Sequence, residues 1–474
     1  MKASVTFLAL MISAIAFGQT ESTLYFMNSL SQSVTENPAT LPRYKFSLGI
    51  PGSSTLISYT NNGFSYNDLV KRGGDSVTVD FSKWLSKLAK KNYTSVGVNT
   101  DLFRLGIRTK KDVYLMMNVM ARGYGRFMFP KDMAALFLEG TGNYVGQTLH
   151  ISPKAEGMGW VEVGLGTSIP ITEKLRVGGR IKYLKGIVNA TTVRSDASLQ
   201  IANDYSITAA ADMSIKTSGF NKISDGNMKF SDFSGNTGFG LDLGATWQML
   251  PKLQLSASLI DIGYIKWSND ITYYQLDPET DRYTFKGIDL GELLNGHDDY
   301  WSAQADSLEK NFKVKELTGS GYATALPMRG FASANYTLSK NTNVGALLFI
   351  ENFHGRFAPG LTTTVNNQLS KFVSTTVSYT MSNRAYGNLG AGLSLNFAPI
   401  QVYIVGDNIL RLPFSLMANK NANNYVNNAQ VVNLRAGLNI VWGWKKTKAE
   451  IDQTIEKKPR RNGKNNAVKV RESK

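Results

Sequence analysis

Fourteen stretches of the chain alternate apolar with polar residues, and the connectors between them alternate mostly short with mostly long. The clearest stretch is GFGLDLGATWQ, in which Phe239, Leu241 and Trp247 share one face while Asp242 lies on the other. Successive side chains of a β-strand point to opposite sides, so each stretch predicts a strand with one apolar face. Soluble sandwiches use such strands too, but tight turns at one rim and long loops at the other are typical of a closed transmembrane barrel.

The N-terminus favours the membrane barrel over the sandwich. A positive start precedes the apolar run Ala3–Phe17, and Ala16 and Gly18 occupy the −3 and −1 positions of a small-residue cleavage site. This pattern predicts a Sec signal peptide over residues 1–18, cleaved after Gly18. No later segment has 18 consecutive apolar residues, so we expect an exported chain that crosses the outer membrane with strands.

The fold class that follows is all-β: a transmembrane antiparallel barrel of about 14 strands over residues 44–444. The even strand count places both ends of the barrel at the tight-turn rim, which is periplasmic in outer-membrane barrels. The alternation slips between Asn99 and Leu102 and again at Ile260-Asp261. Each slip predicts a β-bulge, which either shapes the barrel or opens its wall.

The long connectors, which we expect to be extracellular loops, contain short helical patterns. Asp80–Lys91 has apolar residues at helical spacing behind a possible Asp80 cap, Met133–Leu138 follows Pro130, and Ile288–Leu294 is a third candidate. These helices either pack the loops together or form an apolar vestibule at the barrel mouth.

Charge is concentrated at the C-terminus. The chain carries a net charge of +16, and residues 445–474 hold eleven Lys and Arg against four Asp and Glu. We expect a disordered periplasmic tail, which either contacts anionic lipid headgroups or stays solvated. The expected surroundings are outer-membrane lipid and lipopolysaccharide, and nucleic acid is not an expected partner of an exported chain.

The sequence offers little that is typical of an enzyme. It has no Cys and three His, and the GxSxG, HExxH and P-loop motifs are absent. We therefore predict no catalytic residues, no metal and no cofactor. The inward strand faces instead supply charged residues for the lumen, namely Arg176, Arg180, Lys182, Asp242 and Arg435. The bases among them either meet a ligand carboxylate or pair with lumen acids such as Asp242.

The segment LYFMNSLSQSVTENPATLPRYKFSLGIPG opens the predicted mature chain. Its MNxLxQSxxxNPA pattern, the IPG bend and the following GFSYNDL resemble a family of outer-membrane barrels of unknown function from Bacteroidota. Asn37, Pro38 and Ala39 also resemble the lumen element of the long-chain fatty acid transporters, which have fourteen strands. That resemblance implies that residues 19–43 form a hatch, a segment that plugs the lumen, with Asn37, Pro38 and Ala39 at its centre. The basic tail departs from those transporters.

Three functions remain open at this point. The leading hypothesis is a gated passive channel for the uptake of small hydrophobic molecules such as fatty acids. The alternative is a docking or binding barrel, similar to the shuttle components of type IX secretion, whose extracellular loops hold a protein partner. The third is a structural membrane protein.

Overall fold

The computed structural model of the protein describes residues 21–62, 70–73, 76–221, 235–277, 282–285, 310–353, 356–382, 385–407 and 431–445. The predicted signal peptide, the helix candidate Ile288–Leu294 and nearly all of the C-terminal tail lie outside these residues.

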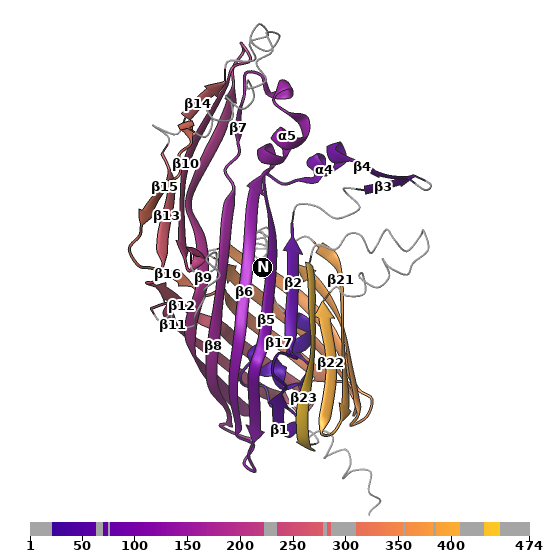
Figure 1. Ribbon diagram of the computed structural model, residues 1–474. Coiled ribbons are helices and arrows are strands. Elements are labelled where there is room, and N and C mark those ends of the chain that lie inside the picture. The colour runs from indigo at the N-terminus through magenta and orange to yellow at the C-terminus, as the bar shows by residue number, and fades with distance from the viewer. Residues whose placement is uncertain are drawn as a thin grey trace, which may run out of the picture.

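Fourteen antiparallel strands form a closed up-and-down barrel, as the alternation predicts (Figure 1). The first and eighth strands are each interrupted, so each consists of two labelled elements. The barrel elements in spatial order are β1 (Tyr44–Gly49) with β2 (Thr55–Asn61), β5 (Lys91–Arg108), β6 (Tyr114–Pro130), β8 (Lys154–Pro170), β9 (Leu175–Ile201), β11 (Thr237–Leu250), β12 (Leu253–Trp267), β16 (Tyr322–Ala325) with β17 (Met328–Thr337), β18 (Thr342–Phe353), β19 (Arg356–Gln368), β20 (Val373–Ser382), β21 (Ala385–Phe397), β22 (Ile400–Asp407) and β23 (Val431–Trp444).

The barrel closes between its first and last strands. Tyr44 to Gly49 pair with Trp444 to Asn439, and Thr55 to Thr60 pair with Ala436 to Val431. The break between β1 and β2 falls at the predicted Pro51-Gly52 bend, where Gly52 has a φ of 73°. Closure leaves no unpaired barrel edge, which a bilayer requires of a sheet.

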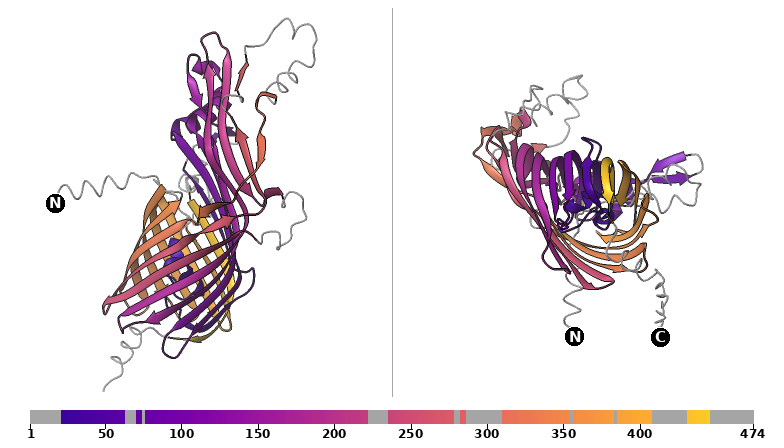
Figure 2. Two further views of the ribbon diagram at one scale, coloured as in Figure 1. Left: turned by 90° about the vertical axis from the view of Figure 1, so that its left-hand side faces the viewer. Right: turned by 90° about the horizontal axis from the view of Figure 1, so that it is seen from below.

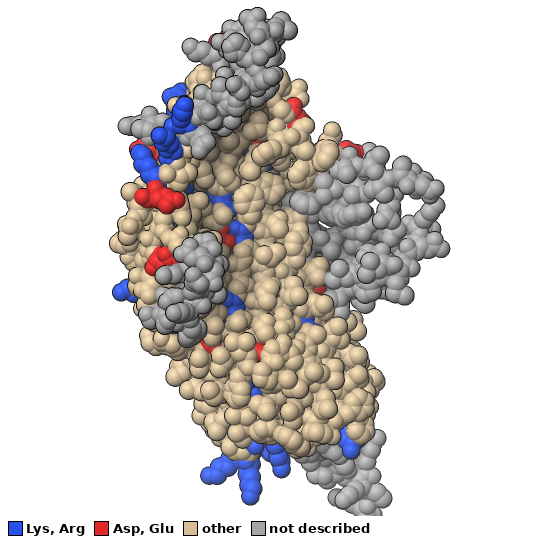
Figure 3. Space-filling view, in the orientation of Figure 1, with Lys and Arg blue, Asp and Glu red and all other residues tan. Residues whose placement is uncertain are grey.

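The in–out alternation agrees with the predicted faces. Phe239 and Trp247 of β11 are exposed on the outside, whereas Asp242 is fully buried inside. On β23, Trp442 is exposed and Arg435 is buried. On the face that Figure 3 shows, few charged residues are visible at the level of the barrel, and Lys and Arg gather beneath it at the tight-turn rim.

Both predicted bulges are present. The register between β5 and β6 shifts between Asp101 and Phe103, and that between β11 and β12 shifts between Leu241 and Leu243. At the second shift Asp261 has a φ of 63°, and both Ile260 and Asp261 are buried. The extra residue therefore turns a carboxylate into the lumen where strict alternation would point it outward.

The long connectors contain more strand than the alternation predicts. β9 continues for 27 residues, and its upper half pairs with β10 (Ile207–Ser218) and β7 (Thr148–His150). β10 in turn pairs with β13 (Ile271–Leu276) and β14 (Arg282–Phe285), and β13 pairs with β15 (Lys315–Thr318). These strands form a sheet that rises above the barrel on one side (Figures 1 and 2).

Two of the predicted loop helices are present above the barrel. α4 (Phe81–Lys87) begins at Asp80, whose side chain accepts a hydrogen bond from Lys83 N at 2.9 Å, and α5 (Lys131–Glu139) follows Pro130. The two helices pack through Leu85, Leu88, Ala134 and Ala135. A small hairpin of β3 (Val70–Gly73) and β4 (Ser76–Val79) lies beside them. Within the described part of the chain, every helix is too short or too polar to cross a membrane.

Candidate functional site: the hatch and the barrel interior

The described part of the hatch, residues 21–43, lies inside the barrel (Figure 2). It contains one turn of α-helix, α2 (Ser22–Tyr25), and a short 3-10 helix, η1 (Ser31–Thr35), and every residue of both is buried. Leu24, Met27 and Leu30 pack against Tyr403 and Val405 of β22. The polar hatch residues contact the wall through side-chain hydrogen bonds, so the hatch is a folded plug with contacts on several strands.

Asn37, Pro38 and Ala39 form a tight turn at the lower end of the hatch. Ala39 N donates to Asn37 Oδ1 at 2.9 Å, and Asn37 Nδ2 donates to the Tyr25 hydroxyl at 3.1 Å. This side-chain-to-backbone bond is the local turn that Asn favours. The Ser168 hydroxyl of β8 donates to Ala39 O at 3.2 Å and so attaches the turn to the wall.

Two glycines leave room for this turn. Gly178 of β9 and Gly244 of β11 are paired across the sheet. A Cβ on Gly178 would overlap the backbone of Pro38 and Ala39, and a Cβ on Gly244 would overlap Asn37. The turn therefore lies directly on the backbone of two neighbouring strands, where only glycine permits so close an approach.

Above this turn, eight buried charged side chains form a network that we call the charge layer. It joins four bases to four acids: Arg122, Arg180, Lys182, Arg329, Glu36, Glu162, Asp242 and Asp261. All eight are less than one tenth exposed at the side chain. Seven come from the barrel wall and Glu36 comes from the hatch.

Asp261 lies at the centre of the charge layer. Its carboxylate accepts from Arg122 at 2.8 Å, from Lys182 at 2.5 Å and from Arg329 at 3.2 Å. The bulge at this residue explains why it reaches all three, since the left-handed backbone turns its side chain inward. A non-glycine residue with positive φ is uncommon and points to a local requirement.

Arg329 connects this wall network to the hatch. Its Nη1 lies 3.1 and 2.9 Å from the two carboxylate oxygens of Glu36, while its Nη2 reaches Asp261. The Ser258 hydroxyl donates to Glu36 O at 2.6 Å. Breaking a buried pair leaves an uncompensated charge, so the Arg329–Glu36 contact is the strongest polar attachment between this wall and the hatch.

The five charged residues predicted for the lumen lie in three places. Arg180 and Lys182 both bind Asp242, at 2.7 and 2.6 Å, so these three belong to the charge layer. Arg435 makes a two-bond contact with Glu21 of the hatch, at 2.6 and 2.7 Å. Arg176 lies at the lower rim, half-buried, and donates to backbone oxygens of Ser168 and Asp112.

An apolar layer covers the charge layer on the side of the long loops. Its buried residues are Tyr124, Met158, Trp160, Leu184, Ile265, Trp267 and Leu326. The Arg122 guanidinium lies 4.9 Å from the centre of the Trp160 ring and joins the two layers. Arg122 Nε and Trp160 Nε1 are buried donors without an acceptor among the described residues.

Apart from the Arg435–Glu21 pair, the opposite wall holds the hatch mainly through neutral groups. The Thr23 hydroxyl bonds Ser378 at 2.7 Å and Asp407 at 2.6 Å, and Ser29 bonds Ser374 at 2.9 Å. Gln32 and Asn439 exchange two amide hydrogen bonds at 2.9 and 3.1 Å. Here hydroxyls and amides, with Asp407 at the upper edge, replace the ion pairs of the charge layer.

Sequence reasoning missed five members of the charge layer: Arg122, Glu162, Asp261, Arg329 and Glu36. The alternation of inward and outward residues places Arg122, Glu162 and Arg329 on inward faces. The reasoning that selected Arg180 could therefore have selected these three as well. Alternation predicts the wrong face for Asp261, because the bulge at this residue reverses the order of inward and outward positions. Glu36 precedes the Asn-Pro-Ala turn directly, but its partner is 293 residues away in sequence.

The fold and the interior together define a transmembrane β-barrel with an internal plug. A family described as "Family of unknown function (DUF5723)" matches residues 38–407, which are 370 of the 474 residues. The chain therefore belongs to this family. No curated protein matches the sequence.

Several solved structures are similar to this chain over most of its length. The Ralstonia pickettii toluene transporter TbuX has 11% sequence identity and a TM-score of 0.44, over 91% of this chain and 100% of that chain. A Pseudomonas aeruginosa FadL homologue has 9% identity and a TM-score of 0.40, over 91% and 100%. The Pseudomonas putida toluene transporter TodX has 10% identity and a TM-score of 0.38, over 90% and 95%.

Proposed function

We propose that this protein is a gated, passive channel in the outer membrane for small hydrophobic molecules, with the hatch as its gate. The observation that carries the proposal is the plug itself: a closed barrel whose lumen is filled by residues 21–43. Most attachments between hatch and wall involve side chains, so the hatch can be released without unfolding a strand. A barrel of fourteen strands is wide enough to need such a filling.

The order of the interior layers supports a hydrophobic ligand with a polar head. A molecule that enters from the long-loop side meets the apolar layer first and the charge layer next. The unpaired donors Trp160 Nε1 and Arg122 Nε lie at that boundary. A carboxylate there would satisfy buried donors and would compete with Glu36 for Arg329, which would weaken the hold on the hatch.

An engineered disulfide tests the gate directly, because the natural chain has no Cys. Ser29→Cys with Ser374→Cys would join the hatch to β20 at a point where the two hydroxyls are 2.9 Å apart. The matched control is Thr362→Cys with Thr380→Cys, which joins two wall strands at a 2.8 Å contact without the hatch. Uptake of a labelled long-chain fatty acid into liposomes is the measurement.

We expect uptake by the reduced hatch pair, its loss on oxidation and its return on reduction, with no such change in the control. Uptake that continues through the oxidised hatch pair would show that the hatch is not the gate. No uptake by any form, including the wild type, would contradict transport of this ligand.

Recognition of the head group has its own test. Trp160→Phe keeps an aromatic ring, although a smaller one, and removes the N–H donor. Uptake of the fatty acid should therefore fall about tenfold more than uptake of the hydrocarbon with the same chain. Equal effects on the two molecules would contradict a polar contact at Trp160.

The sheet above the barrel favours a second candidate, a barrel that binds a protein partner. β9, β10, β13, β14 and β15 rise beyond the barrel as a continuous surface (Figure 2). A channel does not require such a surface, whereas a docking protein does. Capture of one soluble protein that is lost when residues 191–218 are shortened to a tight turn, with no uptake in liposomes, would favour this second candidate.

A further inference from the structure

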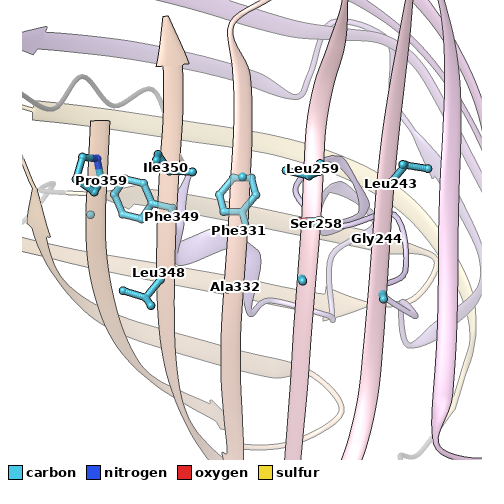
Figure 4. A pocket seen from close by; sticks show the side chains of 14 residues that line it. Leu243, Gly244, Ser258, Leu259, Phe331, Ala332, Leu348, Phe349, Ile350 and Pro359 are labelled. Atoms are coloured by element: carbon cyan, nitrogen blue, oxygen red, sulfur yellow. The ribbon is translucent and has the colours of Figure 1, made fainter. Parts of the chain in front are cut away.

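An apolar concavity lies on the outer face of the barrel wall (Figure 4). This open hollow has a volume of about 690 Å³ and extends over β11, β12, β17, β18 and β19. Its floor consists of small outward residues, among them Ala257, Gly330 and Ala332, and its sides include Leu259, Leu348 and Ile350. A run of small residues among large ones therefore leaves a hollow in a face that is otherwise covered by Leu, Ile and Val.

The aromatic residues around it place this hollow within the lipid-facing band. Phe239 and Tyr264 are exposed on the side of the long loops, and Trp247 and Tyr336 are exposed on the side of the tight turns. Exposed aromatics at two levels mark the two membrane interfaces of a barrel. The medium that faces the concavity is therefore the hydrocarbon of the bilayer, and the concavity is open to acyl chains.

Two exposed lysines lie below the concavity, at the tight turns of the same strands. Lys252 joins β11 to β12 and Lys340 joins β17 to β18, and neither turn contains an acidic residue. Ala257 lies five residues above Lys252, which is about 16 Å along a strand. One leaflet of the hydrocarbon core is about 15 Å thick, so an acyl chain anchored at these lysines reaches the concavity.

From these two observations we propose a binding site for an anionic phospholipid on the outer wall. The phosphate binds at Lys252 and Lys340, and one acyl chain fills the hollow above Ala257 and Ala332. The concavity supplies shape and the lysines supply charge, so the site selects a lipid by its chain and by its head group. This site is separate from the lumen and does not depend on the proposed transport function.

The experiment counts lipids that remain on the purified barrel by native mass spectrometry, with phosphatidylglycerol or phosphatidylcholine added in equal amounts. Ala257→Leu with Ala332→Leu fills the hollow, and Ala436→Leu on the far wall is its control because that residue is exposed on β23. Lys252→Gln with Lys340→Gln removes the charge, and Lys110→Gln with Lys111→Gln at the β5–β6 turn is the matched control.

We expect the wild type and both controls to retain one phosphatidylglycerol in preference to phosphatidylcholine. The filled variant should lose this lipid, and the uncharged variant should lose the preference by about fivefold per lysine. Retention in the filled variant equal to that of Ala436→Leu would overturn the acyl-chain site. An unchanged preference in the Lys252 and Lys340 variant would overturn the head-group site, and a dimer that fills the face in place of lipid would overturn both. All the substitutions face lipid or water, and a folded-barrel band on an unheated gel checks each variant.

Discussion

The two sides of the barrel interior hold the same plug by different chemistry. On the charged wall, formed by β6, β8, β9, β11, β12 and β17, the inward residues build the charge layer and reach the hatch through Arg329 and Glu36. On the neutral wall, formed by β19, β20 and β21, the described inward residues between 359 and 397 are Thr, Ser, Asn, Gln and Gly, without a charge.

The difference bears on how the hatch is released. A hydroxyl contact such as Ser29–Ser374 is worth about 1 kcal/mol, whereas loss of one partner from a buried ion pair costs about 3–5 kcal/mol. The hatch is therefore attached firmly on the charged wall and weakly on the neutral wall. A ligand that displaces Glu36 from Arg329 removes the ion pair on the charged wall, and the Arg435–Glu21 pair on β23 and the neutral contacts then hold the plug.

The largest expected effect follows from Arg329→Met. Glu36 then keeps no basic partner among the described residues, and Asp261 loses one of its three basic partners. The free energy of unfolding should therefore fall by about 3–5 kcal/mol. Denaturant unfolding of the barrel in liposomes measures it. Adding Glu36→Gln should recover part of the loss, since the stranded carboxylate is then neutral. A loss below about 1 kcal/mol would place Arg329–Glu36 in the same class as the hydroxyl contacts of the neutral wall.

Glycine substitutions compare the two walls by steric fit. Gly178→Ala on the charged wall meets the backbone of Pro38 and Ala39, which cannot yield, so we expect a loss of about 1–3 kcal/mol. Gly179→Ala is the control, because its Cβ meets atoms only at 3.8 Å and beyond. Gly392→Ala on the neutral wall meets the flexible end of Met27 and should cost less than Gly178→Ala. Equal losses at Gly178 and Gly392 in the same unfolding measurement would contradict this order.

A single hydroxyl tests the neutral wall. Ser374→Ala leaves the Ser29 hydroxyl without its wall partner and should lower the unfolding free energy by about 0.5–1.5 kcal/mol. Removing both hydroxyls should cost little more than removing one, because no buried group is then left unpaired. A loss as large as that of Arg329→Met would erase the contrast between the walls.

The smallest effect is expected at the tight-turn rim, where Asp112 forms ion pairs that are partly exposed to solvent. Comparison with the buried pairs of the charge layer shows how much burial contributes to the free energy of unfolding. Asp112 accepts from Lys445 Nζ at 2.8 Å and from Arg108 Nε at 3.0 Å. Partial burial acts to raise the pKa of Asp112, but the hydrogen bonds from Lys445 and Arg108 outweigh it and hold the pKa below its ordinary value of 3.8. The contribution of Asp112 to the free energy of unfolding is therefore present above its ordinary pKa. It is lost as the pH falls through the lower pKa of the folded state.

Asp112→Asn should lower the unfolding free energy by no more than about 1 kcal/mol at pH 7. The difference from the wild type should shrink toward zero at pH 2, where both chains carry a neutral side chain at this position. Unfolding curves at the two pH values check it. A difference that grows as the pH falls would contradict the sign of the pKa shift.

Much of the barrel was predictable because strand alternation is a local property. Short runs of neighbouring residues predict the strand count, both bulges, the Pro51-Gly52 bend and the Asp80 cap. All of these features are found in the structure. The sheet above the barrel was not predicted. In residues 191–201 of β9 the apolar alternation is short, with Ala197, Leu199 and Ile201 in an otherwise mostly polar segment, so this strand resembles a polar loop in sequence.

The interior was predictable residue by residue but not as a network. The alternation of inward and outward residues placed Arg180, Lys182, Asp242 and Arg435 on inward faces. It did not indicate which of these side chains pair with each other. Asp261 shows the limit most clearly, since a bulge of one residue moves its carboxylate from the expected outer face to the centre of the charge layer.

The sequence by itself determined which segments are strands and which face of each is apolar, because side-chain alternation acts between neighbours along the chain. The tertiary structure alone decided which charges pair and where the hatch lies. Closure brings Arg329 to Glu36 and Arg435 to Glu21 across 293 and 414 residues of sequence. Such contacts depend on the barrel's circumference and register, which are properties of all fourteen strands together.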